Sequence, residues 1–345
     1  MGVTEAQLER SRAIQRRTGR TFYLATRFLP ERVREPTHVL YAFFRLADEI
    51  VDGGGSTTPE AQRAALAELR DAVLGDATPE DPVVAAFAEV RRSHGIPAED
   101  VETFLDAMAQ DVDTDRYRSY EELEGYMDGS AAAVGRMMTA IMAPDDPEAA
   151  MPHATALGEA FQLTNFVRDV REDARDLGRV YLPATTLADH GASQADVLAL
   201  RSTESVRRAV AAEVLRAETL YRDGVAGIGL LPEDCRFPVT LAAVLYADHH
   251  RRVRAVDYDV VSQRPSLSRA RALRLSGRTW VAWRRSGRDP EETFYRASCV
   301  PRTPDDAPPA ERVVPEPETS GPGPLVRDRL PSPGVGGKIA VLFGR

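Results

Sequence analysis

The chain has 345 residues, of which 43% are apolar and 28% charged, with a net charge of −9 and a pI near 5.4. This length and apolar content are enough to bury a hydrophobic core, whereas the acidic balance disfavours a phosphate backbone, so we expect no nucleic acid partner. The two cysteines, Cys235 and Cys299, exclude a disulfide scaffold and a four-cysteine zinc site.

Residues 1–20 contain no apolar stretch of the kind found in secretory signals. The longest apolar stretch, residues 131–143, is interrupted by Gly135 and Arg136, so no segment is predicted to span a membrane. We therefore expect a cytoplasmic protein.

Arginine supplies nearly all of the positive charge, because Lys338 is the only lysine among the 44 basic residues. A bias toward GC-rich codons explains this pattern most simply. Whatever its origin, an anion site in this protein has to be built from arginine side chains and helix N-termini.

Up to about residue 287, apolar residues recur at intervals of three and four, the period of an α-helix. Proline and glycine fall where helices should begin or end: residues 96–100 should start one helix, and residues 143–148 should separate two others. Strict alternation typical of strands is nearly absent, and no internal repeat is found. The sequence therefore predicts one all-α domain of about ten helices, spanning residues 1–296.

Residues 297–345 differ in composition from the rest of the chain. Ten of the 24 prolines lie between Pro301 and Pro333, among Asp, Glu, Arg and Gly. Such a segment cannot bury enough apolar area to offset the entropy lost on ordering, so we expect a disordered tail.

The first group of candidate site residues lies in residues 41–52. Asp48 and Asp52 are four positions apart, so on a helix they share one face, and Arg45 precedes Asp48 by three positions on that face. Two such carboxylates repel each other by a few tenths of a kcal/mol unless a cation lies between them. An isolated pair of this kind is more often a solvated helix end, which here would precede the glycines at positions 53–55.

A second segment carries a polar ladder at spacings of three, four and four residues: Gln162, Asn165, Asp169 and Asp173. Apolar residues occupy the positions between them, which indicates an interior polar site rather than a wet surface. Two helices that each present an Asp-x-x-x-Asp pair can face one another across a bundle and form a metal site.

Hard oxygen ligands without histidine or cysteine favour Mg²⁺ or Mn²⁺ over zinc or copper. Because Mg²⁺ commonly shares its carboxylates with substrate phosphates, the pattern points to a diphosphate substrate. The arginines that could clamp its oxygens are Arg45, Arg168, Arg171 and Arg179. Arg168 and Arg171 could equally point outward and pair with Glu172 or Asp176.

These two segments resemble the squalene/phytoene synthase family. The resemblance rests on Tyr-Ala-Phe-Phe-Arg-x-x-Asp-Glu-Ile-Val-Asp at 41–52, on Leu-Thr-Asn-Phe-x-Arg-Asp-Val-x-Glu-Asp-Ala at 163–174 and on Gly-Arg-Val-Tyr-Leu-Pro at 178–183. Residues 18–30, residues 126–135, and Leu245 and Tyr246 with Arg264 are similar in the same order. The resemblance covers about residues 14–275.

The resemblance implies an all-α, single-domain isoprenoid synthase bundle with a central cavity. It also implies a prenyltransferase of carotenoid biosynthesis that joins two geranylgeranyl diphosphates head to head, through a cyclopropylcarbinyl (prephytoene) diphosphate, into phytoene without NADPH. The alternatives are a squalene, hydroxysqualene or dehydrosqualene type of synthase using farnesyl diphosphate, and a non-catalytic assembly protein that retains the fold. The four intact aspartates argue against the latter.

The resemblance further implies roles for individual residues. The metal ions, Mg²⁺ or Mn²⁺, would be held by Asp48, Asp52, Asn165, Asp169 and Asp173. The four aspartates would form the catalytic set together with Arg45 and Tyr41. The residues expected to bind substrate are Arg20, Thr21, Phe22, Gln162, Asn165, Arg168, Arg179, Tyr181, Tyr246 and Arg264.

Two positions depart from the family's pattern. Asp128 stands where phytoene synthases often have tyrosine, and an acid there could perturb the second ionisation or the rearrangement. Glu49 stands where a third aspartate is common, but Asp48 and Asp52 keep their spacing.

Two weaker motifs are set aside. Residues 111–122 imitate a calcium loop, but Arg116 occupies the position that needs glycine, so a helix end is preferred. His249 and His250 are adjacent and diverge on a helix, which disfavours a shared metal.

Trp280 and Trp283 lie close to Arg284 and Arg285 in the sequence. They could form a membrane-facing edge, because the expected substrate is lipid-like, although ordinary helix packing is the simpler interpretation. Peripheral contact with a membrane is therefore left open, and no oligomeric state is predicted.

Overall fold

The computed structural model describes residues 3–18, 25–52 and 58–303, and for residues 16–18 and 52 it describes the backbone only. In these ranges the one β-type pairing is a parallel bridge between Arg116 and Val180. The α-helices there are α1 (Glu5–Thr18), α3 (Glu31–Asp52), α4 (Pro59–Leu74), α5 (Pro82–His94), α6 (Ala98–Gln110), α7 (Tyr120–Met127), α8 (Ala133–Met142), α9 (Pro147–Glu172), α10 (Ala184–Asp189), α11 (Gln194–Leu198), α12 (Glu204–Ala226), α13 (Glu233–Ala255), α14 (Arg269–Arg285) and α15 (Pro290–Ala297).

Three shorter helical turns complete the described structure: the π-helices η1 (Asp128–Ala132) and η2 (Asp173–Leu177), and the 3₁₀-helix η3 (Ile228–Leu230). The predicted all-α fold is confirmed. The expected number of about ten helices is too low, since the described residues contain fourteen α-helices. The excess comes from α7, α10, α11 and α15, which have eight residues or fewer and are too short to show a clear apolar period.

The helix ends predicted from proline and glycine are confirmed. Pro97 directly precedes α6. Asp146 accepts a hydrogen bond from the amide of Ala149, and Pro147 occupies the first turn of α9, so both residues favour a helix start at this point.

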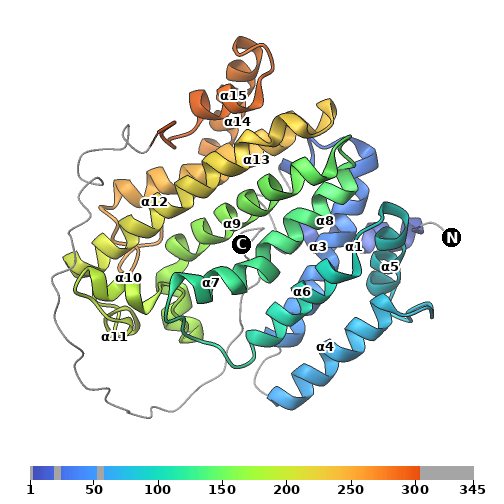
Figure 1. The fold of residues 1–345 in the computed structure, drawn as a ribbon, viewed down its shortest axis with the longest axis horizontal. Helices are drawn as coiled ribbons and strands as arrows, with labels where there is room; N and C mark the ends of the chain where they lie inside the picture. Colours follow the sequence, from blue (N-terminus) through green and yellow to red (C-terminus); the bar gives the residue numbers. More distant parts are fainter. Residues whose placement is uncertain (1–2, 19–24, 53–57, 304–345) are drawn as a thin grey trace.

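Helix α9 runs through the middle of the bundle, with α12 and α13 on one side and α7, α8 and η1 on the other (Figure 1). Apolar and polar residues alike are buried along its second half, from Ala156 to Val170. A helix buried all round cannot be recognised by a single apolar stripe, and its polar residues must find partners inside the protein.

Small residues allow α9 to approach its neighbours closely. A Cβ added at Gly158 would lie 2.7 Å from the carbonyl oxygen of Ala131 in η1, and one at Gly224 of α12 would lie 2.8 Å from the backbone nitrogen of Leu157. Both distances are shorter than any ordinary contact. The spacing between α9, α12 and η1 therefore depends on glycine at these positions.

No helix in the described part of the chain is both long and apolar enough to cross a membrane. The predicted tail from residue 297 lies mainly outside the described residues. Its first part packs on the domain, since Val300 is buried and the Cys299 thiol contacts the carbonyl oxygen of Ala247 at 3.2 Å.

We expect Gly224→Ala to lower the free energy of unfolding by about 1–3 kcal/mol, because the added methyl group overpacks the α9–α12 contact. Gly277→Ala in α14 is the matched control: nothing lies within 4 Å of its added Cβ, and alanine favours an exposed helix by up to about 1 kcal/mol. Urea unfolding of both variants measures the difference. Equal stability of the two would contradict the close packing of α9 against α12.

Candidate active site

Helix α3 presents a buried polar face. Asp48 is 1% exposed, and the guanidinium of Arg45 donates a hydrogen bond to its carboxylate. A buried carboxylate needs such a partner, because desolvation without compensation costs several kcal/mol. Tyr41, two turns earlier on the same helix, is equally buried. Asp52 closes α3, but its side chain lies outside the described structure.

Three of the predicted substrate-binding residues, Arg20, Thr21 and Phe22, lie outside the described residues. Their assignment stays a prediction.

The polar ladder of α9 is buried as predicted. Gln162, Asn165, Asp169 and Asp173 are exposed by 0, 1, 7 and 4% respectively. The Gln162 side-chain amide donates to the hydroxyl of Ser130 in η1 at 3.5 Å. Its carbonyl oxygen, Oε1, is buried and accepts no hydrogen bond from any described residue. A buried acceptor without a hydrogen-bond donor is suited to a ligand that brings a positive charge or a donor of its own.

Arg168 points inward and pairs with Asp169. Its Nε and Nη2 atoms donate to the two carboxylate oxygens at 2.9 and 2.5 Å. Burial alone would lower the pKa of Arg168, but the charge and hydrogen bond of Asp169 raise it above the usual value. Of the two predicted orientations, Arg168 therefore takes the inward one.

The Arg171 side chain contacts the backbone of a distant segment. Its Nη1 atom donates to the carbonyl oxygens of Val261 and Ser262 at 2.9 and 3.2 Å. It thereby ties α9 to the segment that follows α13. This segment carries Arg264, whose Nη1 lies 2.5 Å from Glu172 and whose Nη2 lies 3.7 Å from Asp169.

Tyr246 of α13 connects the α3 face to the α9 ladder. Burial is the main cause that raises its pKa above the ordinary value; the Arg168 charge opposes this effect, and Tyr41 and Asp169 add to it. Groups from α3, α9 and α13 thus interact electrostatically at one place. Tyr41 of α3 and the Arg168–Asp169 pair of α9 thus both act on the Tyr246 hydroxyl. That the aspartate pairs of α3 and α9 face one another stays a prediction.

The π-helix η2 continues α9 and begins at Asp173. Such wider turns re-aim side chains and often occur at functional sites. The amide of Arg179 donates to the carbonyl oxygen of Asp173 at 2.9 Å, so the chain folds back immediately after the ladder. Tyr181 then stacks on Phe166 with ring centroids 4.0 Å apart.

The Arg179 side chain is turned toward Asp111, a residue that the sequence analysis assigned only to a helix end. Its Nη2 atom donates to the Asp111 carbonyl oxygen at 2.5 Å, and its Nη1 lies 3.5 Å from the carboxylate. Tyr126 also donates to this carboxylate, at 2.9 Å. Burial raises the pKa of Asp111 to about 6, against the opposing effects of Arg179 and Tyr126. Binding of a diphosphate by Arg179 stays a prediction.

His249 is a second residue whose position sequence reasoning missed. It is 5% exposed, and its Nδ1 accepts no hydrogen bond in the described structure. Burial and then the charge of Arg168 lower its pKa well below the usual value, while Asp169 opposes them. The charges of the Arg168–Asp169 pair therefore act on the His249 imidazole, whose ring contacts that of Tyr246. Only its position three residues after Tyr246 could have indicated this.

Among the described side chains, no three His, Cys, Asp or Glu residues lie together as a ready metal cluster. The two site carboxylates Asp48 and Asp169 are each balanced by an arginine instead. The assignment of the five metal ligands stays a prediction.

A largely apolar pocket lies between α8, α9, α12, η3 and α13; it is called the cavity below. Residues that line it include Leu29, Met138, Phe161, Gly224, Ile228 and Val239. Phe161 stacks on Tyr246 with ring centroids 4.6 Å apart, so the cavity adjoins the polar site. The arrangement suits a ligand with a charged head and a long apolar chain.

Comparison with known proteins agrees with this geometry. The family model for squalene/phytoene synthase matches residues 15–271. This chain belongs to the squalene/phytoene synthase family. It is 35% identical over 277 residues to the phytoene synthase of Rhodobacter capsulatus, covering 79% of this chain and 80% of that protein. It is 36% identical over 283 residues to the phytoene synthase of Cereibacter sphaeroides, covering 79% and 78%.

Solved structures of the squalene/phytoene synthase family share the fold. A dehydrosqualene synthase in complex with a ligand matches with a TM-score of 0.72 and 26% identity, covering 79% of this chain and 95% of that chain. The squalene synthase of Alicyclobacillus acidocaldarius matches with a TM-score of 0.64 and 29% identity, covering 74% and 97%.

Asp128, which departs from the family's tyrosine, has a clear partner. Arg136 donates to Asp128 at 2.7 Å and to Asp100 at 2.6 Å. The Asp128 side chain is 49% exposed. The acid is thus held in an ion pair near the surface, between α6 and α8.

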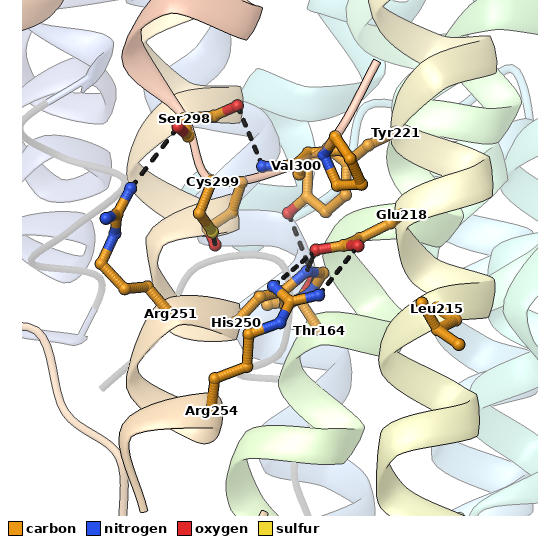
Figure 2. A network of polar contacts seen from close by, with 12 residues as sticks. Thr164, Leu215, Glu218, Tyr221, His250, Arg251, Arg254, Ser298, Cys299 and Val300 are labelled. Atoms are coloured by element: carbon orange, nitrogen blue, oxygen red, sulfur yellow. Dashed lines mark hydrogen bonds and ion pairs between the residues drawn. The ribbon is translucent and has the colours of Figure 1, made fainter. Parts of the chain in front are cut away.

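A buried polar network fixes the ladder helix in the family fold (Figure 2). The Thr164 hydroxyl donates to the carbonyl oxygen of Ala160, so its oxygen is left to accept from Tyr221 and His250, which lie 3.1 and 2.9 Å away. His250 also lies 3.2 Å from Glu218 of α12.

Arg254 completes the network with two hydrogen bonds to Glu218, at 2.8 and 3.0 Å. Burial alone would raise the pKa of Glu218, but hydrogen bonds from His250 and Arg254 overcome it and lower the pKa. Thr164 precedes Asn165 directly. The network therefore holds α9 in register at the level of the ladder.

We expect Glu218→Gln to destabilise the protein by about 3 kcal/mol at neutral pH, because the buried cation Arg254 loses its counter-charge. The pKa of Glu218 is lowered in the folded state, so its contribution is present above the ordinary value of 4.5 and is lost as the pH falls through the folded value. The gap between wild type and variant should therefore shrink in acid. Denaturant unfolding at several pH values measures it.

Glu204→Gln, at the exposed start of the same helix, is the control. Its effect should stay within about 0.5 kcal/mol, since surface ion pairs contribute little. A loss for Glu218→Gln no larger than this would contradict the anchoring role of the network.

Proposed function

We propose that this protein is a phytoene synthase, which joins two geranylgeranyl diphosphates head to head through prephytoene diphosphate. The observation that carries the proposal is the buried ladder of α9, which adjoins both the α3 face and an apolar cavity. The similarity to phytoene synthases over about four fifths of the chain supports the substrate and product. Each half-reaction releases one diphosphate and one proton, so the reaction balances without NADPH.

The residues of the site fit Mg²⁺ or Mn²⁺. Every candidate ligand offers a hard oxygen, the donor that these ions prefer. We propose that the ions are held by Asp48, Asp52, Asn165, Asp169 and Asp173. When bound, they supply Lewis-acid stabilisation of negative charge on the departing diphosphate.

The arginines of the site would bind and orient the diphosphates. Arg45, Arg168 and Arg264 each contact a site carboxylate, so they are already held at the place where phosphate oxygens would enter. Planar guanidinium groups suit such oxygens, because they offer paired N–H donors. Arg20, Arg179 and Thr21 are further candidates from the family resemblance.

The cavity would take the prenyl chains and exclude water from the carbocations. Its lining is mainly aliphatic and aromatic, and the faces of Phe161 and Tyr246 can stabilise positive charge. Gln162 and Tyr181 would orient the substrate, as the family resemblance implies.

A second candidate function is a dehydrosqualene or squalene type of condensation that uses farnesyl diphosphate. The structural similarity to a dehydrosqualene synthase favours it. We further propose that the enzyme is cytoplasmic and contacts a membrane peripherally.

The test is a product assay with purified protein, geranylgeranyl diphosphate and Mg²⁺, with and without NADPH, read by mass spectrometry. The proposal expects a C40 triene hydrocarbon in both reactions. Turnover of farnesyl diphosphate alone, or accumulation of a cyclopropyl intermediate, would favour the second candidate and make Asp128→Tyr the first variant to examine.

We expect Asp48→Asn and Asp169→Asn each to lower kcat by about 10²–10³-fold or more, because both carboxylates would hold the metal ions that stabilise charge on the departing diphosphate. Circular dichroism should show a retained helical fold. Asp113→Asn, at an exposed surface pair with Arg63, is the matched control and should keep full activity. A wild-type rate in either site variant would contradict the assignment of that aspartate as a metal ligand.

A further inference from the structure

Helix α14 exposes apolar side chains on its outer face. It packs on the domain through Ala272, Leu275, Thr279, Ala282 and Trp283. On the opposite face Leu273 is 72% exposed, Trp280 51% and Val281 46%. Helix packing is therefore the correct interpretation for Trp283, which is buried, whereas Trp280 lies at the surface. Figure 1 shows α14 and α15 on the outer side of α13.

The same face carries unpaired positive charge. Arg269, Arg274, Arg284 and Arg285 are all exposed, and none forms a salt bridge within the described structure. Helix α14 contains no acidic residue, although the whole chain has a net charge of −9. We call Leu273, Trp280, Val281 and these four arginines the α14 face. A basic face with exposed Trp and Leu is typical of helices that lie on lipid surfaces.

A chain of ring contacts leads from the α14 face to residues beside the apolar cavity. Trp280 contacts the ring of Phe237 with centroids 5.4 Å apart, and Phe237 contacts Phe28 at 5.9 Å. Phe28 is 48% exposed, yet its chain neighbour Leu29 lines the cavity.

The same relation recurs once more: Leu230 is 39% exposed, and its neighbour Leu231 lines the cavity. Pro238 also lines the cavity and follows Phe237, which is half-buried. Exposed apolar side chains therefore lie next to residues of the cavity wall.

We propose that the α14 face docks on an anionic lipid bilayer and brings the neighbouring end of the cavity close to the membrane. Trp280 and Leu273 enter the interface between headgroups and acyl chains, and the arginines contact lipid phosphates. The inference rests on the proposed function in one respect: a C40 hydrocarbon product has no polar group and transfers to lipid far more readily than to water. Arginine near an anionic surface adds to binding at each position.

The test is co-sedimentation of the full chain with vesicles of equal parts phosphatidylglycerol and phosphatidylcholine, compared with vesicles of phosphatidylcholine alone. Wild type should bind the anionic vesicles, less so at high salt. Arg274→Gln and Arg284→Gln should each weaken binding about fivefold, and Trp280→Ser should weaken it further. Arg208→Gln, at an exposed arginine of α12, is the control and should bind as wild type does.

Activity on short time scales gives a second readout. Trp280→Ser should keep the amount of product formed in the first turnover, while its multiple-turnover rate in the presence of vesicles falls below that of wild type. None of the α14 residues belongs to the proposed catalytic set.

Three outcomes would overturn the inference: no binding of wild type to anionic vesicles, equal binding by wild type and all three variants, or burial of the α14 face in a dimer that Trp280→Ser dissociates. Vesicle binding needs no turnover, so failure of the inference is distinguishable from failure of the proposed function. If the protein makes phytoene but does not bind vesicles, only the membrane-docking inference is contradicted. If it binds vesicles through the α14 face but makes no phytoene, only the proposed function is contradicted.

Discussion

The structure depends on one constraint: carboxylates buried inside an apolar bundle must be matched by cations. Asp48 is paired with Arg45, and Asp169 with Arg168. Without these partners, each carboxylate would be expelled from the interior or would take up a proton. The paired arrangement gives each carboxylate a counter-charge in the free protein. A ligand that brings metal and diphosphate can then exchange partners with both members of each pair, so every buried charge keeps a counter-charge.

The ladder residues keep their positions only if α9 is held in register with its neighbours. Contacts from the rest of the bundle hold it there. Gly158 and Gly224 bring its neighbours close, while Thr164 ties its far face to Tyr221 and His250. After the ladder, η2 turns the chain so that Tyr181 packs on Phe166, one residue beyond Asn165. The polar site and the apolar cavity are therefore two sides of one central helix, joined where Phe161 stacks on Tyr246.

The fold class and the inward direction of the ladder could be predicted from the sequence, because both follow from local spacing. Gln162, Asn165 and Asp169 share a face whatever surrounds them. The direction of Arg171 could not be predicted, since its partners Val261 and Ser262 lie about ninety positions later in the chain. Asp111 and His249 were missed for the same reason: their significance comes from Arg179 and Arg168, which only the tertiary fold brings near them.

Thermal unfolding of the full chain with Mg²⁺ and inorganic pyrophosphate, compared with each alone, tests most directly whether α3 and α9 share one site. A ligand that binds only the native state stabilises it by about 2.7 kcal/mol at a hundredfold excess over its Kd, and this raises the midpoint of unfolding. We expect the midpoint of wild type to rise when both ligands are present. This rise should be lost in both Asp48→Asn of α3 and Asp169→Asn of α9. No rise in wild type, or an undiminished rise in either variant, would contradict a single site shared by the two helices.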